Sequence, residues 1–113
     1  MLEHAELEGV HPEIRARAEW AISWAEYYGV PVTVTSGFRS LEDQARLRAK
    51  WEAGLSRWPA NRPGESAHNV GLAWDSTVPS WASSWWVRVR ELAGFRIPAG
   101  DEIHAEWPGW RQV

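Results

Sequence analysis

The sequence predicts an α+β fold, in which a small, mainly antiparallel sheet carries about three helices packed mainly on one face. Helical and extended patterns alternate in the order α-β-α-β-α-β-β, and the extended segments are short. The 113 residues suffice for one domain, which we expect to span residues 1–113. Because the chain contains no cysteine, its core must be held by packing without disulfides.

The N-terminal third predicts one helix followed by one strand. Pro12 suits the first turn of a helix, because its missing N–H would have no partner there. Apolar residues then recur with helical spacing as far as Tyr28, and Gly29 is a natural stop. The β-branched run at residues 30–35 predicts a short strand.

A second helix is predicted over residues 41–53. Ser40 suits its N-cap, and Asp43 occupies the reciprocal position of a capping box. The apolar repeat expected to face the core comprises Leu41, Ala45 and Trp51. Proline, glycine and asparagine then make residues 56–69 a loop.

The C-terminal half predicts a strand, a helix and a final pair of strands. Residues 71–76 form the first of these strands, and a helix opens at Pro79. The apolar stripe of this helix comprises Ala82, Trp85, Trp86, Val89 and Leu92. A short strand at residues 95–97 then leads through a turn at 98–101 to a last strand at 102–107.

Charge and hydropathy exclude two classes of partner. Twelve basic and 15 acidic residues give a net charge of −3, so the chain lacks the excess of positive charge typical of nucleic-acid-binding domains. The longest uncharged stretch, residues 76–87, is too short and too polar to cross a bilayer, so we expect no membrane insertion. Residues 1–8 lack the basic and apolar regions of a Sec signal peptide, so we expect synthesis in the cytoplasm.

Three residues have the chemistry of a metal site. Of the four histidines, His4 and His11 lie in a polar N-terminal segment, where a surface position is expected. His68 falls where the predicted loop passes into a strand, and Asp75 follows seven residues later near the end of that strand. His104 lies on another predicted strand. Two imidazoles and one carboxylate form a zinc site that leaves one position open. On residue type alone, ordinary polar residues at a sheet edge remain the alternative.

Residues 66–75, SAHNVGLAWD, resemble the S-x-H-x-x-G-x-A-x-D signature of D-alanyl-D-alanine carboxypeptidase-type zinc metallopeptidases, and all five fixed positions match. That group includes D-Ala-D-Ala dipeptidases and L-alanyl-D-glutamate endopeptidases. Residues 101–106 resemble its second element, with an acidic residue three positions before a histidine. Residues 36–44 resemble its S-G-[FY]-R-S-x-x-x-Q stretch, and the three elements stand in the family's order.

The resemblance implies a fold and a set of roles. The fold would be the hedgehog/D-Ala-D-Ala peptidase type, a small antiparallel sheet with helices. Zn²⁺ would be held by His68, Asp75 and His104. Asp101 would be the general base toward the attacking water and would later protonate the leaving amine. Arg39 would lie near the scissile carbonyl and stabilise its developing negative charge.

The identity of the base has an alternative. Side chains alternate between the faces of a strand, so Glu102 and Glu106 would share the face of His104, whereas Asp101 would not. Alternation alone would therefore select Glu102. Asp101 falls at the predicted turn, where alternation need not hold, and the resemblance favours it.

Four further residues are given supporting roles. Ser66 is expected to contact substrate or a ligand of the metal. Glu106 would orient a metal ligand, and Gln44 would hold the loop that carries Arg39. Trp107 is close to the site in sequence and is expected to line a substrate groove.

Tryptophan is unusually frequent, with ten residues among the 14 aromatic side chains. Five fall on or beside helical apolar stripes and are expected in or at the edge of the core: Trp20, Trp24, Trp51, Trp85 and Trp86. Trp74 should also be buried, because strand alternation turns it away from Asp75. Four others are freer to line a groove: Trp58, Trp81, Trp107 and Trp110.

We therefore expect a zinc-dependent peptidase that cleaves peptidoglycan stem peptides, most simply an endolysin-like L-alanyl-D-glutamate endopeptidase. A D-Ala-D-Ala carboxypeptidase or dipeptidase is the alternative within this chemistry. A non-catalytic wall-binding module of the same fold is the alternative outside it, although retention of all the site residues favours catalysis. We expect a monomer that acts at the cell wall after release, in phage-type lysis or from a virion.

Overall fold

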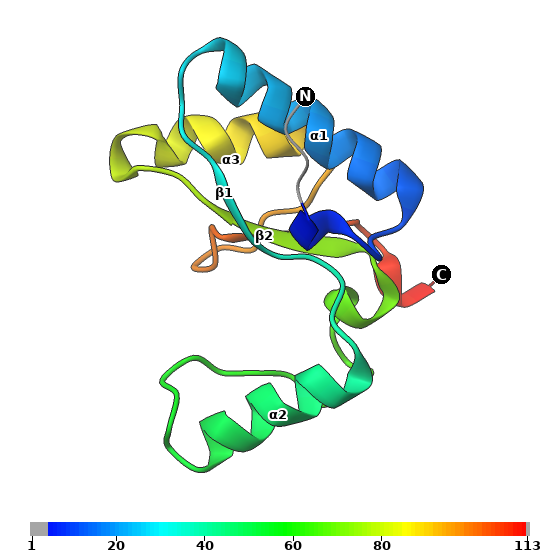
Figure 1. Ribbon diagram of the computed structural model, residues 1–113. Helices are drawn as coiled ribbons and strands as arrows, with labels where there is room; N and C mark the ends of the chain where they lie inside the picture. Colours follow the sequence, from blue (N-terminus) through cyan, green and yellow to red (C-terminus); the bar gives the residue numbers. More distant parts are fainter. Residues whose placement is uncertain (1–4, 113) are drawn as a thin grey trace.

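A computed structural model describes residues 5–112, and they form three α-helices and one three-stranded antiparallel sheet. In chain order the elements are α1 (Pro12–Tyr27), β1 (Thr33–Ser36), α2 (Leu41–Glu52), β2 (Ala73–Thr77), α3 (Ser83–Leu92) and β3 (His104–Glu106). Helices α1 and α3 lie on one side of the sheet and α2 on the other (Figure 1). The predicted α+β fold is confirmed. None of these helices has the length and apolar character needed to span a membrane.

The sheet brings together three polar residues that are far apart in sequence. Its strand order is β1-β2-β3, with both pairings antiparallel. Asp75 on β2 stands opposite Ser36 on one side and opposite His104 on the other. Because opposed residues in a sheet lie about 5 Å apart, this register alone places Asp75 next to His104.

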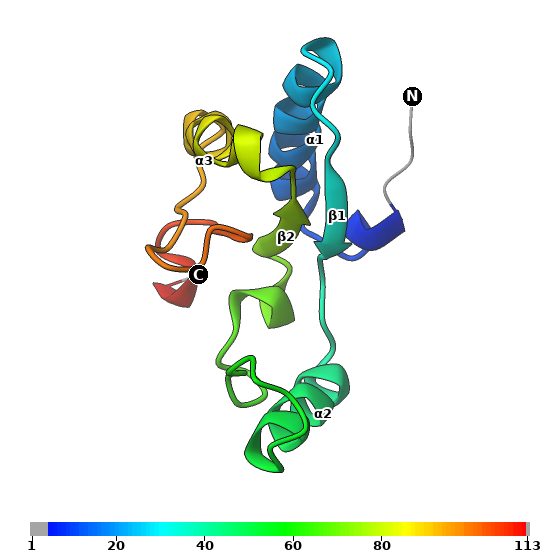
Figure 2. The same ribbon diagram turned by 90° about the vertical axis from the view of Figure 1, so that its left-hand side faces the viewer.

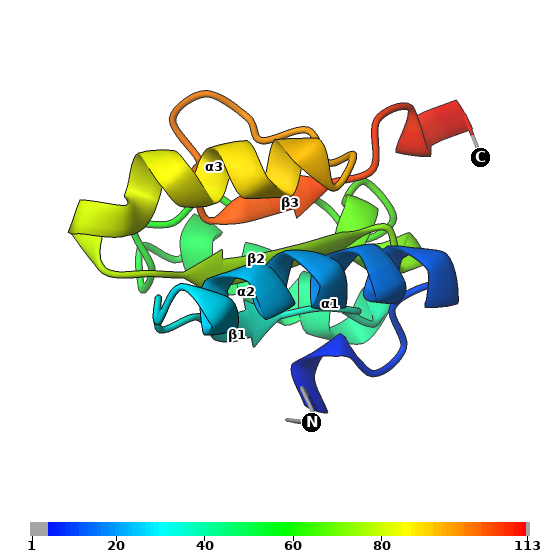
Figure 3. The same ribbon diagram turned by 90° about the horizontal axis from the view of Figure 1, so that it is seen from above.

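The core lies between the sheet and helices α1 and α3, as the view from above shows (Figure 3). Trp74 is fully buried and packs edge-on against Trp86 and Phe95, at ring-centroid distances of 6.1 and 5.7 Å. The indole N–H of Trp86 donates to the hydroxyl of Ser76 at 2.9 Å. Trp74 therefore has the buried position predicted for it, and its neighbour Asp75 points to the opposite face.

The last predicted strands are shorter than expected. Residues 95–97 form only one isolated bridge, between Arg96 and Glu106. Pro98 cannot donate to a ladder, which stops the pairing there. Residues 101–103 belong to a turn, so β3 begins only at His104.

Helix α2 projects from the body of the molecule (Figures 1 and 2). Its predicted apolar repeat is wrong, because Leu41 and Ala45 are exposed and Gln44 is its one buried residue. Side chains of Gln44 and Arg48 instead donate to backbone carbonyls of residues 60–61. The helix is thus held by hydrogen bonds to the following loop.

The tryptophan predictions hold in part. Trp86 is buried, whereas Trp51 and Trp85 are half-buried. Trp20 and Trp24 were expected in or at the edge of the core and are instead 44% and 41% exposed. The reason is that smaller residues on α1 fill the space against the sheet: Ile14, Ala18, Ala21, Ile22 and Ala25.

Candidate active site

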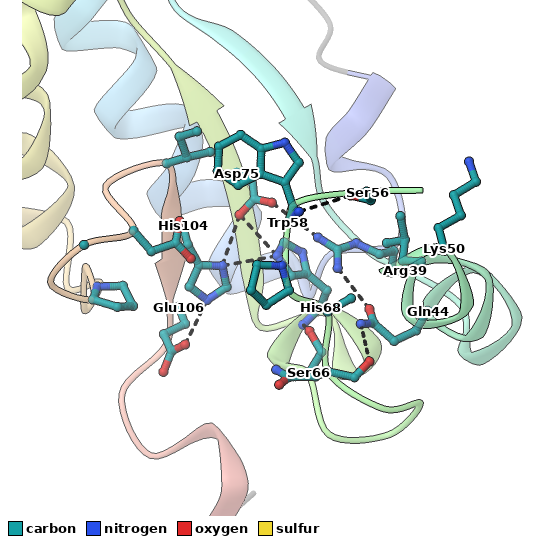
Figure 4. Close-up of a pocket in the computed structure, with 18 residues that line it drawn as sticks. Arg39, Gln44, Lys50, Ser56, Trp58, Ser66, His68, Asp75, His104 and Glu106 are labelled. Atoms are coloured by element: carbon teal, nitrogen blue, oxygen red, sulfur yellow. Dashed lines mark hydrogen bonds and ion pairs between the residues drawn. The ribbon is translucent and has the colours of Figure 1, made fainter. Parts of the chain in front are cut away.

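Three ligand-type side chains converge beside the sheet. The Nε2 atom of His68 lies 3.2 Å from Nδ1 of His104 and 3.2 Å from Oδ1 of Asp75. The third side of the triangle, from Nδ1 of His104 to Oδ1 of Asp75, is 3.0 Å (Figure 4). The three residues predicted as metal ligands therefore direct one atom each to a common point.

The triangle has the dimensions of a zinc site. Zinc binds imidazole nitrogen and carboxylate oxygen at about 2.1 Å, and tetrahedral ligands at that distance are about 3.4 Å apart. The observed separations of 3.0–3.2 Å are close to this value. The donor set of two nitrogens and one oxygen also suits zinc, and a three-ligand set leaves a fourth position open.

Neighbouring groups fix which atom of each ligand faces the common point. The backbone carbonyl of Gly37 can only accept, so Nδ1 of His68, at 2.7 Å, carries the proton and donates to it. Nε2 of His104 donates in the same way to the carboxylate of Glu106 at 2.8 Å. The lone pairs of His68 Nε2 and His104 Nδ1 are left for a metal. Glu106 thus makes the contact expected of a residue that orients a ligand.

The electrostatics keep Asp75 ionised. Burial alone raises the pKa of this carboxyl, but the imidazoles of His104 and His68 beside it outweigh burial and hold the pKa well below its ordinary value. Burial lowers the pKa of His104, whereas Asp75 and Glu106 raise it, and the net pKa is raised. Asp75 therefore keeps a negative charge at its corner of the triangle.

Two glycines and one serine position His68. A Cβ on Gly37 would lie 2.0 Å from the carbonyl oxygen of Glu6, so only glycine fits at this position. Its carbonyl oxygen is the one that accepts the hydrogen bond from His68. Gly71 ends the short helical turn that carries His68, with φ of +73°. The hydroxyl of Ser66 accepts from the backbone N–H of His68 at 3.2 Å. Ser66 is thus an N-cap, and it also lines the pocket.

Arg39 is held beside the triangle by three side chains. Its guanidinium donates to Ser36 at 3.2 Å, to Gln44 at 2.9 Å and to Asp75 at 3.3 Å. Burial lowers its pKa, which Asp75 and Asp43 partly offset. Gln44 is almost fully buried and connects Arg39 to the loop after α2. This matches the supporting role expected of Gln44.

The site lies in a pocket of about 770 Å³ between the sheet and α2. Asp101 lines this pocket together with the three ligand-type residues and Arg39. Glu102, the alternative base, instead lines a separate hollow beside α3. Both residues precede β3, so strand alternation does not apply to them, and the pocket supports Asp101.

The structure does not bring Trp107 into the pocket. Its ring packs against Phe95 at 6.4 Å and under the guanidinium of Arg17 at 4.8 Å. Trp107 is therefore held against Arg17 and Phe95 and is not among the residues that line the pocket. Trp58, which follows α2, does line the pocket and is 66% exposed.

Arg90 is a site-supporting residue that sequence reasoning missed. Its side chain is 1% exposed, and burial lowers its pKa to about 10. The guanidinium donates to the carbonyls of Glu102 at 2.6 Å, Ile103 at 3.3 Å and Trp86 at 3.2 Å. It therefore braces the turn between Asp101 and His104. The only sequence signal was an arginine next to the apolar stripe of α3, which also describes many surface residues.

Replacing Arg90 by methionine should lower the free energy of unfolding by about 2–4 kcal/mol, because two carbonyls in the turn lose a charged donor. Urea denaturation of the variant and the wild type measures this. Arg88→Met is the matched control, since Arg88 is exposed on the same helix. Equal effects of the two substitutions would contradict the bracing role.

Comparison with known proteins gives one family and several solved structures of the same fold. The model of the D-alanyl-D-alanine carboxypeptidase family, VanY, matches residues 8–93. This range includes His68, Asp75 and Arg39, whereas Asp101 and His104 lie beyond it. No curated protein matches the chain.

Among solved structures, the LdcB LD-carboxypeptidase is 25% identical, with a TM-score of 0.74 over 98% of this chain and 72% of its own. The L-Ala D-Glu endopeptidase ChiX of Serratia marcescens is also 25% identical, with a TM-score of 0.60 over 95% and 86% of the two chains. A vancomycin-resistance D,D-pentapeptidase VanY, solved in complex with Zn(II), is 21% identical, with a TM-score of 0.65 over 98% and 81%.

Proposed function

The chain belongs to the D-alanyl-D-alanine carboxypeptidase family of peptidoglycan peptidases, and we propose that it is a zinc-dependent peptidase that cleaves stem peptides. The observation that carries this proposal is the triangle of His68, Asp75 and His104. It has zinc dimensions and opens into a pocket that also contains an acid, Asp101, and a fixed cation, Arg39. The similar D,D-pentapeptidase solved with Zn(II) adds support for zinc.

The proposed chemistry divides between the metal and the chain. Zinc held by the triangle would supply a Lewis acid that polarises the scissile carbonyl and acidifies the attacking water. The carboxylate of Asp101 would take the proton of that water and later give it to the leaving amine, as a general base and acid.

Arg39 is suited to stabilise negative charge on the scissile carbonyl oxygen. A guanidinium has five N–H donors, and three hydrogen bonds hold this one in place. The remaining donors are free to meet a developing oxyanion without any rearrangement, which is the condition for electrostatic catalysis. Gln44 would act by positioning Arg39, and Ser66 by capping the turn that carries His68.

For the bond cleaved, we propose the L-alanyl-D-glutamate linkage. In support, the chain spans 86% of the endopeptidase ChiX, a larger share than of the carboxypeptidase LdcB. The second candidate is a carboxypeptidase that releases a terminal D-alanine. The family model that matches the chain and the TM-score of 0.74 with LdcB favour it. In either case the protein would act at the bacterial cell wall, reached by an endolysin-like release.

Mass spectrometry of peptidoglycan fragments tests the proposal and separates the two candidates. The purified, zinc-loaded protein is incubated with peptidoglycan, and Asp101→Ala is treated in parallel. Stem peptides that begin at D-Glu are the expected products. Release of D-Ala or its dipeptide would transfer the assignment to the second candidate. No cleavage with zinc in place would replace both by a non-catalytic wall-binding module.

A further inference from the structure

Five aromatic side chains form a continuous cluster on the outer side of α1 and α3, which we call the aromatic ladder. It comprises Trp20, Trp24, Tyr27 and Tyr28 from the α1 region and Trp85 from α3. Trp20, Trp24 and Tyr28 recur every four residues, so they lie along one helix face. Ring centroids are 6.1 Å apart for Trp20–Trp24, 6.0 Å for Trp24–Tyr28 and 6.0 Å for Tyr28–Trp85. The ladder therefore holds its rings in fixed mutual orientations.

The ladder is far more exposed than core packing requires. Tyr27 and Tyr28 are 78% and 61% exposed, and Trp20 and Trp24 are 44% and 41% exposed. With aromatic side chains of 150–250 Å² each, the exposed part amounts to about 500 Å². An apolar patch of this size on a monomer commonly marks an interaction surface.

The size and charge of the ladder narrow the choice of partner. A stable dimer needs about 800 Å² from each subunit, more than the ladder exposes. An anionic lipid surface or polymer attracts lysine and arginine, but the ladder contains neither. Two arginines of α1 lie near it, and each is paired with a glutamate. Arg15 pairs with Glu19 at 2.8 Å, and Arg17, which lines a hollow together with Trp20, pairs with Glu13 at 3.4 Å. The partner that fits is uncharged.

We propose that the aromatic ladder binds the glycan strands of peptidoglycan, an inference that rests on the proposed function for its choice of polymer. The C–H faces of N-acetylated sugar rings are weakly positive and pack on the negative faces of aromatic rings. Indole N–H and phenol O–H groups at the exposed rim can hydrogen-bond to sugar hydroxyls and acetamido groups.

The ladder and the pocket can be occupied together. Helices α1 and α3 lie on the side of the sheet opposite α2, which forms one wall of the pocket (Figures 1 and 2). A glycan held on the ladder would leave the pocket accessible to a stem peptide of the same polymer. Holding the enzyme on the wall raises the effective concentration of stem peptides at the pocket.

Wall binding and peptide hydrolysis are measured separately on the wild type and three variants. Tyr27→Ser removes a ladder ring that is 78% exposed, and Leu55→Ser is the matched control, 80% exposed beyond the end of α2 and away from the ladder. Trp24→Ser/Tyr28→Ser removes the centre of the ladder, with thermal melting as a check of folding. Binding is measured by co-sedimentation with insoluble peptidoglycan stripped of anionic polymers and by titration with a soluble β-1,4-linked N-acetylglucosamine hexamer. Hydrolysis is measured on a soluble stem peptide that carries no sugar.

The double variant should bind both glycans at least tenfold more weakly, Tyr27→Ser should bind them severalfold more weakly, and Leu55→Ser should bind like the wild type. All should hydrolyse the soluble peptide within twofold of the wild-type rate. Undiminished glycan binding by the folded double variant would overturn the ladder as a glycan site. The glycan site would also be overturned if the wild type formed a dimer that the double variant did not form. Adsorption of the wild type to phosphatidylglycerol vesicles instead of the glycan would overturn it as well. Absence of soluble-peptide hydrolysis in the wild type would count against the proposed function alone.

Discussion

Replacing Asp101 by alanine is expected to lower kcat on a soluble stem peptide by 10²- to 10⁴-fold, the range typical for loss of a general acid–base group. The zinc content of the purified variant should stay at the wild-type level, because Asp101 is not one of the three converging ligands. Its fold should also be retained. The Asp101 side chain is exposed, and the turn is held through backbone bonds from Asp101 N–H to Pro98 and from His104 N–H to Asp101.

The matched control is Glu102→Ala, which removes an equally exposed carboxylate from the adjacent position. Glu102 lines a different hollow, and Arg90 contacts only its backbone carbonyl, which the substitution keeps. Its kcat should therefore stay within a few-fold of wild type. The opposite pattern, with Glu102→Ala inactive and Asp101→Ala active, would make Glu102 the base. Measuring kcat and bound zinc on both variants decides between them.

The convergence of His68, Asp75 and His104 could be predicted because its signal is local. The motif around His68 and Asp75 places these residues on one turn and one strand, and the antiparallel sheet places His104 across from Asp75. Strand alternation failed for Asp101 and Glu102 because β3 is shorter than its sequence pattern and begins at His104. Alternation describes only residues with extended, paired backbone.

What the sequence could not predict depends on which neighbours occupy the space around a side chain. Arg90 and Arg88 are both arginines of α3, and only the turn at residues 102–103 makes one of them buried. On α2 the expected apolar face is exposed, because that helix packs against a loop rather than the sheet. Trp20 and Trp24 are excluded from the core because alanines on α1 already bring that helix close to the sheet.

Contacts that support the site could be predicted only where the two partners are close in sequence. Glu106 lies two residues from His104 on one strand face, so its contact with the imidazole follows from alternation. The carbonyl of Gly37, which orients His68 from 31 residues away, has no side-chain signature. Its only trace in the sequence is the glycine itself, required because the carbonyl of Glu6 leaves no room for a Cβ.

Removal of a metal ligand should have the second large effect. His104→Ala takes away one corner of the triangle, so a metal would keep only His68 and Asp75 from the chain. The zinc affinity should fall by more than the 10- to 100-fold that loss of an orienting partner typically costs. Competition for zinc with a chromophoric chelator measures this directly, without any assay of activity.

Glu106→Gln provides the graded comparison. The amide can still accept from Nε2 of His104, but it lacks the charge that the carboxylate supplies at 2.8 Å. Its zinc affinity should therefore fall at most 10- to 100-fold, between the wild type and His104→Ala. If His104→Ala bound zinc as tightly as Glu106→Gln, His104 would not be a ligand, and the triangle would be a hydrogen-bonded cluster at the sheet edge. A zinc affinity that falls steeply from the wild type to Glu106→Gln and again to His104→Ala would instead identify a metal centre. In that centre, strand β3 supplies both a ligand and the group that orients it.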